Sequence, residues 1–97
     1  MMMGGTADTL VSFTSWTQPF FEGLLAPAFL VRVTDGTHDG FSDSDSRLTP
    51  EALAFQQNAV KRYATPFFFK YLAKKNKYAR RLRATDDATV ALVARPK

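Results

Sequence analysis

The only histidine of this chain, His38, follows a segment with the composition of a buried strand. Residues 28–34 are apolar and often β-branched apart from Arg32, and the Asp35-Gly36 pair that follows favours a turn. A histidine on a loop just after a strand is well placed for chemistry, because the sheet holds the loop and an imidazole changes charge close to neutral pH. His38 is therefore a candidate general base, and a hydrogen-bonded loop residue without a chemical role is the alternative.

A histidine that acts as a base needs a partner to fix its orientation, and Asp8 is the candidate. Asp8 follows an apolar stub, residues 1–3, and a Gly-Gly pair. If the stub ends a strand parallel to residues 28–34, Asp8 and His38 both leave the carboxyl ends of neighbouring strands, which lie about 4.8 Å apart. The sequence separation of 30 positions suits a βαβ crossover, which needs at least about 10–12 residues. An ordinary turn or capping aspartate is the alternative for Asp8.

The composition indicates one small folded domain. The chain has 97 residues, of which 45% are hydrophobic and 13% aromatic, and this content argues against intrinsic disorder. It contains no cysteine, which excludes disulfides and thiolate metal sites. No apolar run approaches the roughly 18 residues of a membrane span, and the first residues lack the basic region of a signal peptide. The sequence leaves the localisation unknown.

The net charge of +4 is unevenly distributed along the chain. Residues 35–51 are mainly acidic, whereas residues 61–83 hold nine basic side chains and no acid. A solvated helix face is the simple explanation for the basic run. A surface for nucleic acid or for an anionic membrane is the alternative, and we do not expect nucleic acid as a partner. The aspartates at 35, 39, 43 and 45 lack the Gly and Glu pattern of a calcium loop, so we expect no metal and no other cofactor.

Helix-capping signals, prolines and hydrophobic spacing predict the elements. Ser15 and Gln18 resemble a capping box, and Pro19 equally suits a first helical position after Gln18, so the start of the first helix stays open. Thr49-Pro50-Glu51 is a helix start that places an acid in the first turn. Pro66 is expected to break or kink the second helix, because proline lacks a backbone donor and clashes with the preceding turn. In chain order we expect a strand end and acid loop at 1–8, a helix at 12–25, a strand at 28–34, a histidine loop at 35–49, a helical segment kinked at Pro66 at 50–83, and a tail at 84–97 in which 89–93 is a short strand or an extended end.

Several other side chains are expected to have structural roles. Phe41 should pack beneath the histidine loop, and Asp43 should bind backbone amides of that loop. Trp16 should lie in the core or be partly buried, with the lining of a substrate pocket as the alternative. Leu53, Val60 and Ala64 should share one buried face of the helix that begins at Pro50, and Phe68, Tyr71 and Leu72 should point toward a core. The run Phe67-Phe68-Phe69 is expected to be core that packs on strands absent from this chain.

Two motifs in order carry a family resemblance. They are Gly5-Thr6-Ala7-Asp8 after one strand and Gly36-x-His38-x-x-Phe41-x-Asp43 after the next. Together with the helix between them and the basic helix that follows, they resemble the last third of an α/β-hydrolase. The similarity is greatest to dienelactone hydrolases, platelet-activating-factor acetylhydrolases and polyester hydrolases, and it covers residues 2 to about 82. It implies an α/β fold, a carboxyl-terminal fragment with the last two parallel strands, a crossover helix and terminal helices.

By this resemblance Asp8 matches the acid and His38 the base of a serine hydrolase triad, which runs Ser, acid, His along the chain. The nucleophile is missing, because G-x-S-x-G does not occur, and GFSDS around Ser42 follows the histidine with only the first glycine. We therefore expect part of a serine hydrolase for small-molecule or lipid carboxylic esters, inactive alone and completed by a missing amino-terminal part of the same fold. The alternatives are a non-catalytic remnant and a basic-helix module that binds nucleic acid or anionic surfaces.

Overall fold

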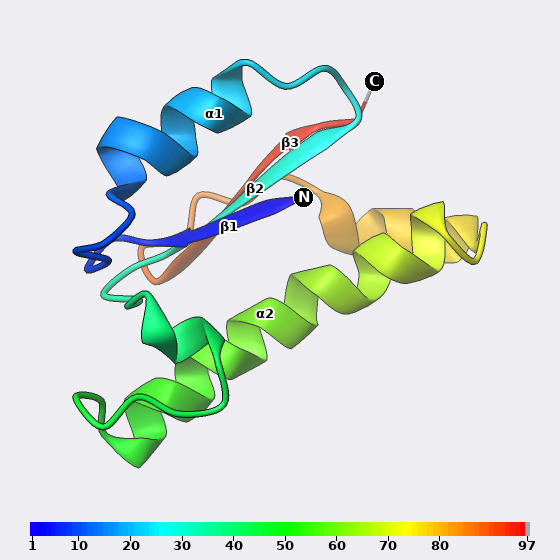
Figure 1. Cartoon of the computed structure of the whole chain (residues 1–97). Helices are drawn as coiled ribbons and strands as arrows, with labels where there is room; N and C mark the ends of the chain where they lie inside the picture. Colours follow the sequence, from blue (N-terminus) through cyan, green and yellow to red (C-terminus); the bar gives the residue numbers. More distant parts are fainter. Residues whose placement is uncertain (97) are drawn as a thin grey trace.

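The chain forms a three-stranded sheet with helices on both faces (Figure 1). The structure, a computed structural model, describes residues 1–96. Strand β1 (Met2–Gly5) pairs in parallel with β2 (Ala28–Val33), as the sequence predicts, and β3 (Val90–Arg95) pairs antiparallel with β2. The sheet order is β1-β2-β3, so the fold is α/β with a small mixed sheet.

Strand β2 builds a core on each face of the sheet, because successive side chains of a strand point to opposite faces. Phe29, Val31 and Val33 point to the face covered by α2 (Pro50–Tyr71), whereas Ala28 and Leu30 point to the opposite face. The larger core adds buried side chains from α2, β3 and the segment between them: Ala59, Tyr63, Leu82, Val90 and Leu92. The smaller core adds Phe13 and Phe21.

The crossover from β1 to β2 is shorter and less regular than the expected helix at 12–25. It consists of a π-helical turn, η1 (Phe13–Thr17), followed by α1 (Gln18–Glu22). The capping box at Ser15 is wrong, because the cap is Ser12, whose Oγ accepts a hydrogen bond from the backbone N–H of Ser15 at 3.2 Å. The alternative start is nearly right, because α1 begins at Gln18 and Pro19 lies in its first turn. The crossover covers one face of the sheet, opposite α2 (Figure 1).

Near its carboxyl end the described chain forms β3. Of the two alternatives for residues 89–93, a short strand or an extended end, the strand is therefore right. Its last residue, Arg95, holds α1 in place. The guanidinium donates hydrogen bonds to the carbonyl oxygens of Phe21 at 2.6 Å and Leu24 at 3.0 Å, and it lies 4.5 Å from the centre of the Phe21 ring. Phe21 lies in the last turn of α1 and Leu24 follows the helix, so Arg95 links both the end of α1 and the segment after it to β3.

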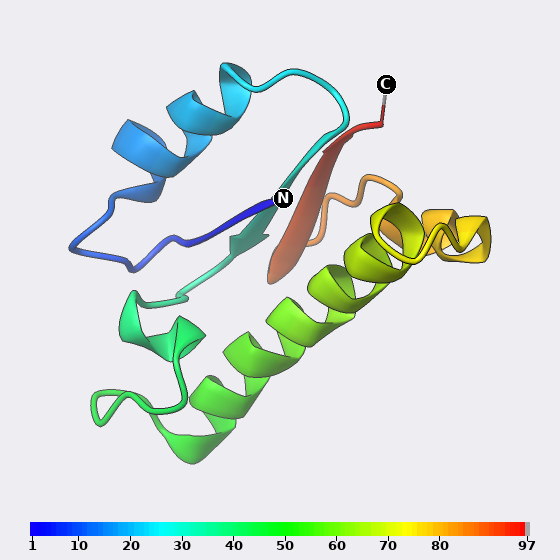
Figure 2. The same ribbon diagram turned by 45° about the vertical axis from the view of Figure 1, so that its right-hand side comes forward.

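Helix α2 begins where the sequence predicts, with Oγ1 of Thr49 accepting a hydrogen bond from the N–H of Ala52 at 3.1 Å. Of the break or kink expected at Pro66, the break is wrong, because α2 is one continuous helix to Tyr71 (Figure 2). Pro66 is buried, and its neighbours Tyr63 and Phe67 pack against the larger core. Packing of the helix on the sheet therefore outweighs the loss of one backbone donor at the proline.

The buried stripe of α2 consists of Gln56, Ala59, Tyr63 and Pro66. The residues expected there, Leu53, Val60 and Ala64, are only half-buried and lie beside the stripe. Phe67 and Tyr71 do face the core, with ring centres 5.9 and 6.0 Å from Phe29.

The second half of the expected helical segment differs most from the prediction. Phe68 and Leu72 are exposed, at 54% and 75%, although both were expected to face the core. The helix ends at Tyr71, and after Lys74, with φ of 57°, the chain forms a 3₁₀ helix, η3 (Asn76–Leu82). Phe69, also expected in the core, instead stacks on Tyr78 of η3 with ring centres 4.8 Å apart. No helix in the described chain is long and apolar enough to cross a bilayer.

Candidate active site

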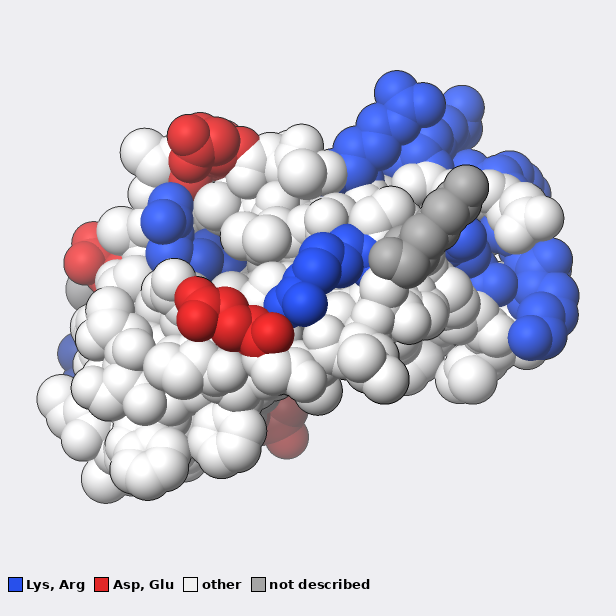
Figure 3. Space-filling model, turned by 90° about the horizontal axis from the view of Figure 1, so that it is seen from above, with Lys and Arg blue, Asp and Glu red and all other residues white. Residues whose placement is uncertain are grey.

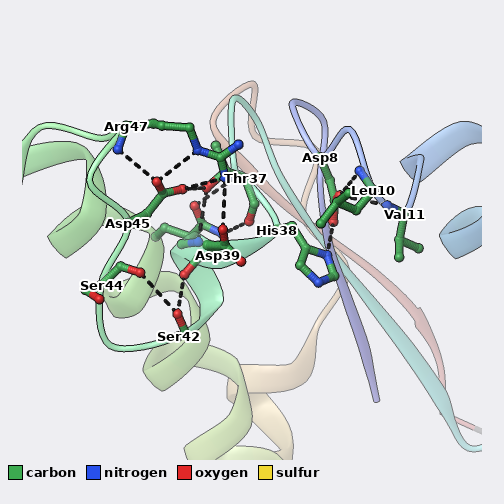
Figure 4. A network of polar contacts seen from close by, with 12 residues as sticks. Asp8, Leu10, Val11, Thr37, His38, Asp39, Ser42, Ser44, Asp45 and Arg47 are labelled. Atoms are coloured by element: carbon green, nitrogen blue, oxygen red, sulfur yellow. Dashed lines mark hydrogen bonds and ion pairs between the residues drawn. The ribbon is translucent and has the colours of Figure 1, made fainter.

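Asp8 and His38 meet at one edge of the sheet (Figure 4). Asp8 lies three residues past the end of β1, and His38 lies five past the end of β2. Oδ2 of Asp8 lies 3.0 Å from Nδ1 of His38, so the parallel pairing brings them together as the sequence predicts. The Asp8 side chain is 7% exposed and that of His38 44%, which leaves the imidazole accessible to a reactant.

Backbone contacts fix the spacing of the two loops. The N–H of Thr6 donates to the carbonyl of Val33 and the N–H of Ala7 to that of Gly36, both at 3.0 Å. Gly5 and Gly36 lie so close that a Cβ on Gly5 would collide with the backbone of Gly36. Glycine is therefore required at this point, and the relative positions of Asp8 and His38 are set by the main chain.

The carboxylate of Asp8 is held by three hydrogen bonds. Oδ1 accepts from the N–H groups of Leu10 at 2.9 Å and Val11 at 2.8 Å, and Oδ2 faces His38. Burial by itself raises the pKa of Asp8, but the hydrogen bonds from Val11, His38 and Leu10 together outweigh it and lower the pKa below its usual value. A carboxylate only accepts hydrogen bonds, so Nδ1 of His38 is the donor and Nε2 is left as the acceptor of the neutral ring.

A buried glutamine holds the backbone next to His38. Oε1 of Gln56 accepts from the N–H of Thr37 at 3.0 Å, and its Nε2 donates to the carbonyl of Thr37 at 2.8 Å. Gln56 is only 2% exposed, and Gly40 lies where any Cβ would collide with its amide group. Gln56 is not among the residues predicted from the sequence. Its position three residues before Ala59, on the buried stripe of α2, is the feature that would have identified it as a buried polar residue.

Asp45 binds the histidine loop from the other side, a role expected for Asp43. Its Oδ2 accepts from Oγ1 of Thr37 at 2.8 Å, and its Oδ1 accepts from the backbone N–H and Nε of Arg47 at 2.9 and 3.1 Å (Figure 4). Hydrogen bonds from Arg47 hold the pKa of Asp45 at about 2. The Asp43 carboxylate makes no hydrogen bond among residues 1–96, so the expectation for Asp43 is wrong.

We predict that Asp45→Asn removes part of the acid sensitivity of the fold. Because the folded-state pKa lies below that of the unfolded chain, Asp45 stabilises the fold above the unfolded pKa of about 4, and this stabilisation is lost as the pH falls toward about 2. Urea unfolding at pH 5 and pH 2.5 should show a smaller drop in the free energy of unfolding for Asp45→Asn than for the wild type. The control is Asp43→Asn, which should behave as the wild type. An equal drop in all three proteins would contradict the prediction.

A hollow of about 610 Å³ opens in front of the Asp8–His38 pair. Its apolar lining comes from Met3, Val11, Phe41 and Val60, and Phe41 also packs against the larger core, as expected for a residue beneath the histidine loop. Trp16 is not part of the lining; it is 55% exposed and stacks on Phe20 with ring centres 6.1 Å apart. Trp16 is therefore exposed, and both core packing and partial burial are wrong for it.

No serine completes the pair within the part of the chain that the structure describes. Ser42 lines the hollow, but its Oγ donates to the carbonyl oxygens of Asp39 at 2.6 Å and Ser44 at 3.2 Å (Figure 4). The described residues also hold no group of three or more histidine or acidic side chains that could bind a metal ion. Asp39 and Asp45 instead share Arg47, which lies 3.1 Å from each carboxylate. The arrangement can therefore accept and return a proton, but it does not itself supply a nucleophile.

In the comparisons with known proteins, the chain matches no protein-family model and no curated protein. The function is therefore argued from the geometry of the site.

Proposed function

We propose that this chain supplies the acid and the base of a serine hydrolase of the α/β-hydrolase fold that acts on carboxylic esters. The observation that carries the proposal is the 3.0 Å contact between Asp8 and His38 past the carboxyl ends of adjacent parallel strands. In α/β sheets, ligands bind outside the carboxyl ends of the strands. A carboxylate that orients an accessible imidazole is also the arrangement that activates a serine hydroxyl.

In the proposed mechanism Nε2 of His38 takes the proton of a serine hydroxyl as its oxygen attacks the acyl carbon. The same proton passes to the alkoxide leaving group when the tetrahedral intermediate collapses to an acyl-enzyme. A water molecule then attacks the acyl-enzyme while His38 takes a proton from that water. His38 returns this proton to the serine oxygen as the carboxylic acid product leaves. Asp8 stays ionised throughout and stabilises the imidazolium, which its lowered pKa favours.

The serine and the oxyanion-binding amides are proposed to come from a segment that pairs with β1. Within residues 1–96, β1 has a neighbouring strand only on its β2 side, so its other edge is open. A further parallel strand at that edge would place the loop that follows it beside Asp8 and His38. The apolar lining of the hollow, including Met3 and Phe41, suits the acyl chain of a small-molecule or lipid ester.

We expect the 97-residue chain alone to hydrolyse short-chain aryl esters no faster than its His38→Ala variant, because it has a base but no nucleophile beside it. The measurement is the release of the aryl alcohol at neutral pH, with Ser42→Ala as the matched control. Turnover that both His38→Ala and Ser42→Ala abolish would show that the nucleophile lies inside this chain, and the proposal of a completing segment would be wrong.

A further inference from the structure

A second hollow, of about 490 Å³, lies between α2 and η3 and shares no lining residue with the hollow at His38. Five cationic side chains line it: Lys61 and Arg62 from α2, Arg80 and Arg81 from η3, and Arg83 just after η3. Its lining also includes Thr65, Tyr78 and Thr85, which carry hydroxyl groups, and no acidic residue. Figure 3 shows Lys and Arg gathered at one end of the molecule, away from most of the acidic side chains.

The positive charge of this hollow is not neutralised within the described chain. None of its five cations forms an ion pair there; among the Lys and Arg residues within 1–96, Arg47 of the histidine loop is the only one that does. The charge of Asp87 interacts with that of Arg62, but the two side chains form no ion pair. The Asp87 carboxylate instead accepts hydrogen bonds from the backbone N–H and Oγ1 of Thr89. Five like charges around one concavity repel one another, and an anion bound between them would relieve that repulsion.

The hollow is formed by packed elements and not by flexible side chains alone. Tyr78 of η3 stacks on Phe69 of α2, with ring centres 4.8 Å apart and planes at 15°. Arg80 and Arg81 belong to η3 and Arg83 follows its last residue, so one short segment beside α2 supplies three of the lining cations. Tyr63, 2% exposed, forms part of the wall and belongs to the larger core.

We propose that this hollow binds a small anion that carries two or more phosphoryl groups. Guanidinium groups match phosphate oxygens with paired N–H donors, and three of the five cations are arginines from one short segment, 80–83. The volume lies within the range of small-ligand sites, whereas nucleic acid is generally bound along an extended groove. A free polyphosphate compound and a phosphorylated lipid headgroup share this chemistry.

The test is a titration of the whole chain with inorganic pyrophosphate, followed by calorimetry and by backbone amide chemical shifts. We expect saturable 1:1 binding, with shifts concentrated at 61–66 and 78–85. Replacing both Arg80 and Arg83 by alanine should weaken binding at least about tenfold. The matched control, Lys74→Ala with Lys75→Ala, removes the same charge outside the hollow and should change affinity by less than about twofold. His38→Ala should leave pyrophosphate affinity unchanged, so this test is separate from that of the hydrolase.

Three results of the titrations would overturn the proposal: no saturable pyrophosphate binding, an equal loss of affinity in the control, or single-stranded DNA binding that is tighter than pyrophosphate binding and equally dependent on Lys74 and Lys75. Sedimentation with phosphatidylcholine vesicles that contain phosphatidylinositol bisphosphate, whose headgroup carries more than one phosphoryl group, identifies the source of the ligand. Vesicle binding lost in the Arg80, Arg83 double variant assigns a lipid headgroup. Pyrophosphate binding without vesicle binding assigns a free compound, and vesicle binding that survives the double variant contradicts the hollow as the site.

Discussion

In the complete serine hydrolase that we propose, His38→Ala should lower kcat for ester hydrolysis by about 10⁴-fold or more, with a much smaller effect on KM. One imidazole takes the proton from the serine and returns it to the leaving group, so both halves of the reaction depend on it. His38 is the only histidine of this chain, which leaves no second imidazole here to replace it. The measurement is steady-state hydrolysis of a short acyl ester by the purified enzyme.

The matched control for this prediction is Asp43→Asn. Asp43 lies in the same loop, is exposed, and its carboxylate makes no hydrogen bond among the residues that the structure describes. Its kcat should stay within about twofold of the wild type, since the substitution touches neither the imidazole nor its partner. A His38→Ala enzyme that keeps more than about a tenth of the wild-type kcat would show that another group is the base.

Asp8→Asn in the proposed complete hydrolase should lower kcat by about 10⁴-fold while the fold is retained. The asparagine oxygen can still accept from Leu10 and Val11, so the acid loop keeps its shape. Its amide nitrogen, a donor, then faces Nδ1 of His38. A donor at that point stabilises the ring with its proton on Nε2, and that nitrogen can no longer accept the serine proton.

A spectroscopic measurement separates this effect from a merely structural role of Asp8. The chain has one histidine, so a ¹⁵N spectrum of histidine side chains reports a single ring. The neutral ring should carry its proton on Nδ1 in the wild type and on Nε2 in Asp8→Asn. The same tautomer in both proteins, together with an unchanged kcat, would contradict the orienting role of Asp8.

The elements that position the pair could be predicted from the sequence because their signals are local. The apolar run at 28–34, the Gly-Gly pair after the first residues and the crossover length lead to two parallel strands. Once those strands are parallel, their carboxyl ends share an edge, and the meeting of Asp8 with His38 follows. The start of α2 at Thr49-Pro50 was predicted for the same reason, since capping depends on adjacent residues.

The remaining features depend on contacts between distant residues. Arg95 binds carbonyls that lie more than 70 positions earlier, and Gln56 clamps Thr37 from another element. The continuity of α2 through Pro66 and the exposure of Phe68 are set by which stripe of the helix meets the sheet. Asp43 and Asp45 have equivalent sequence contexts, and only the folded position of Thr37 selects Asp45.

The most direct test of the central claim is the sequence of the source transcript upstream of the Met1 codon. The account predicts an uninterrupted reading frame that encodes a strand followed by G-x-S-x-G, and ester hydrolysis by the whole product that requires that serine and His38. An in-frame stop codon directly upstream, with no such motif joined to this chain, would contradict it. Asp8 and His38 would then be a hydrogen-bonded pair without a reaction to catalyse.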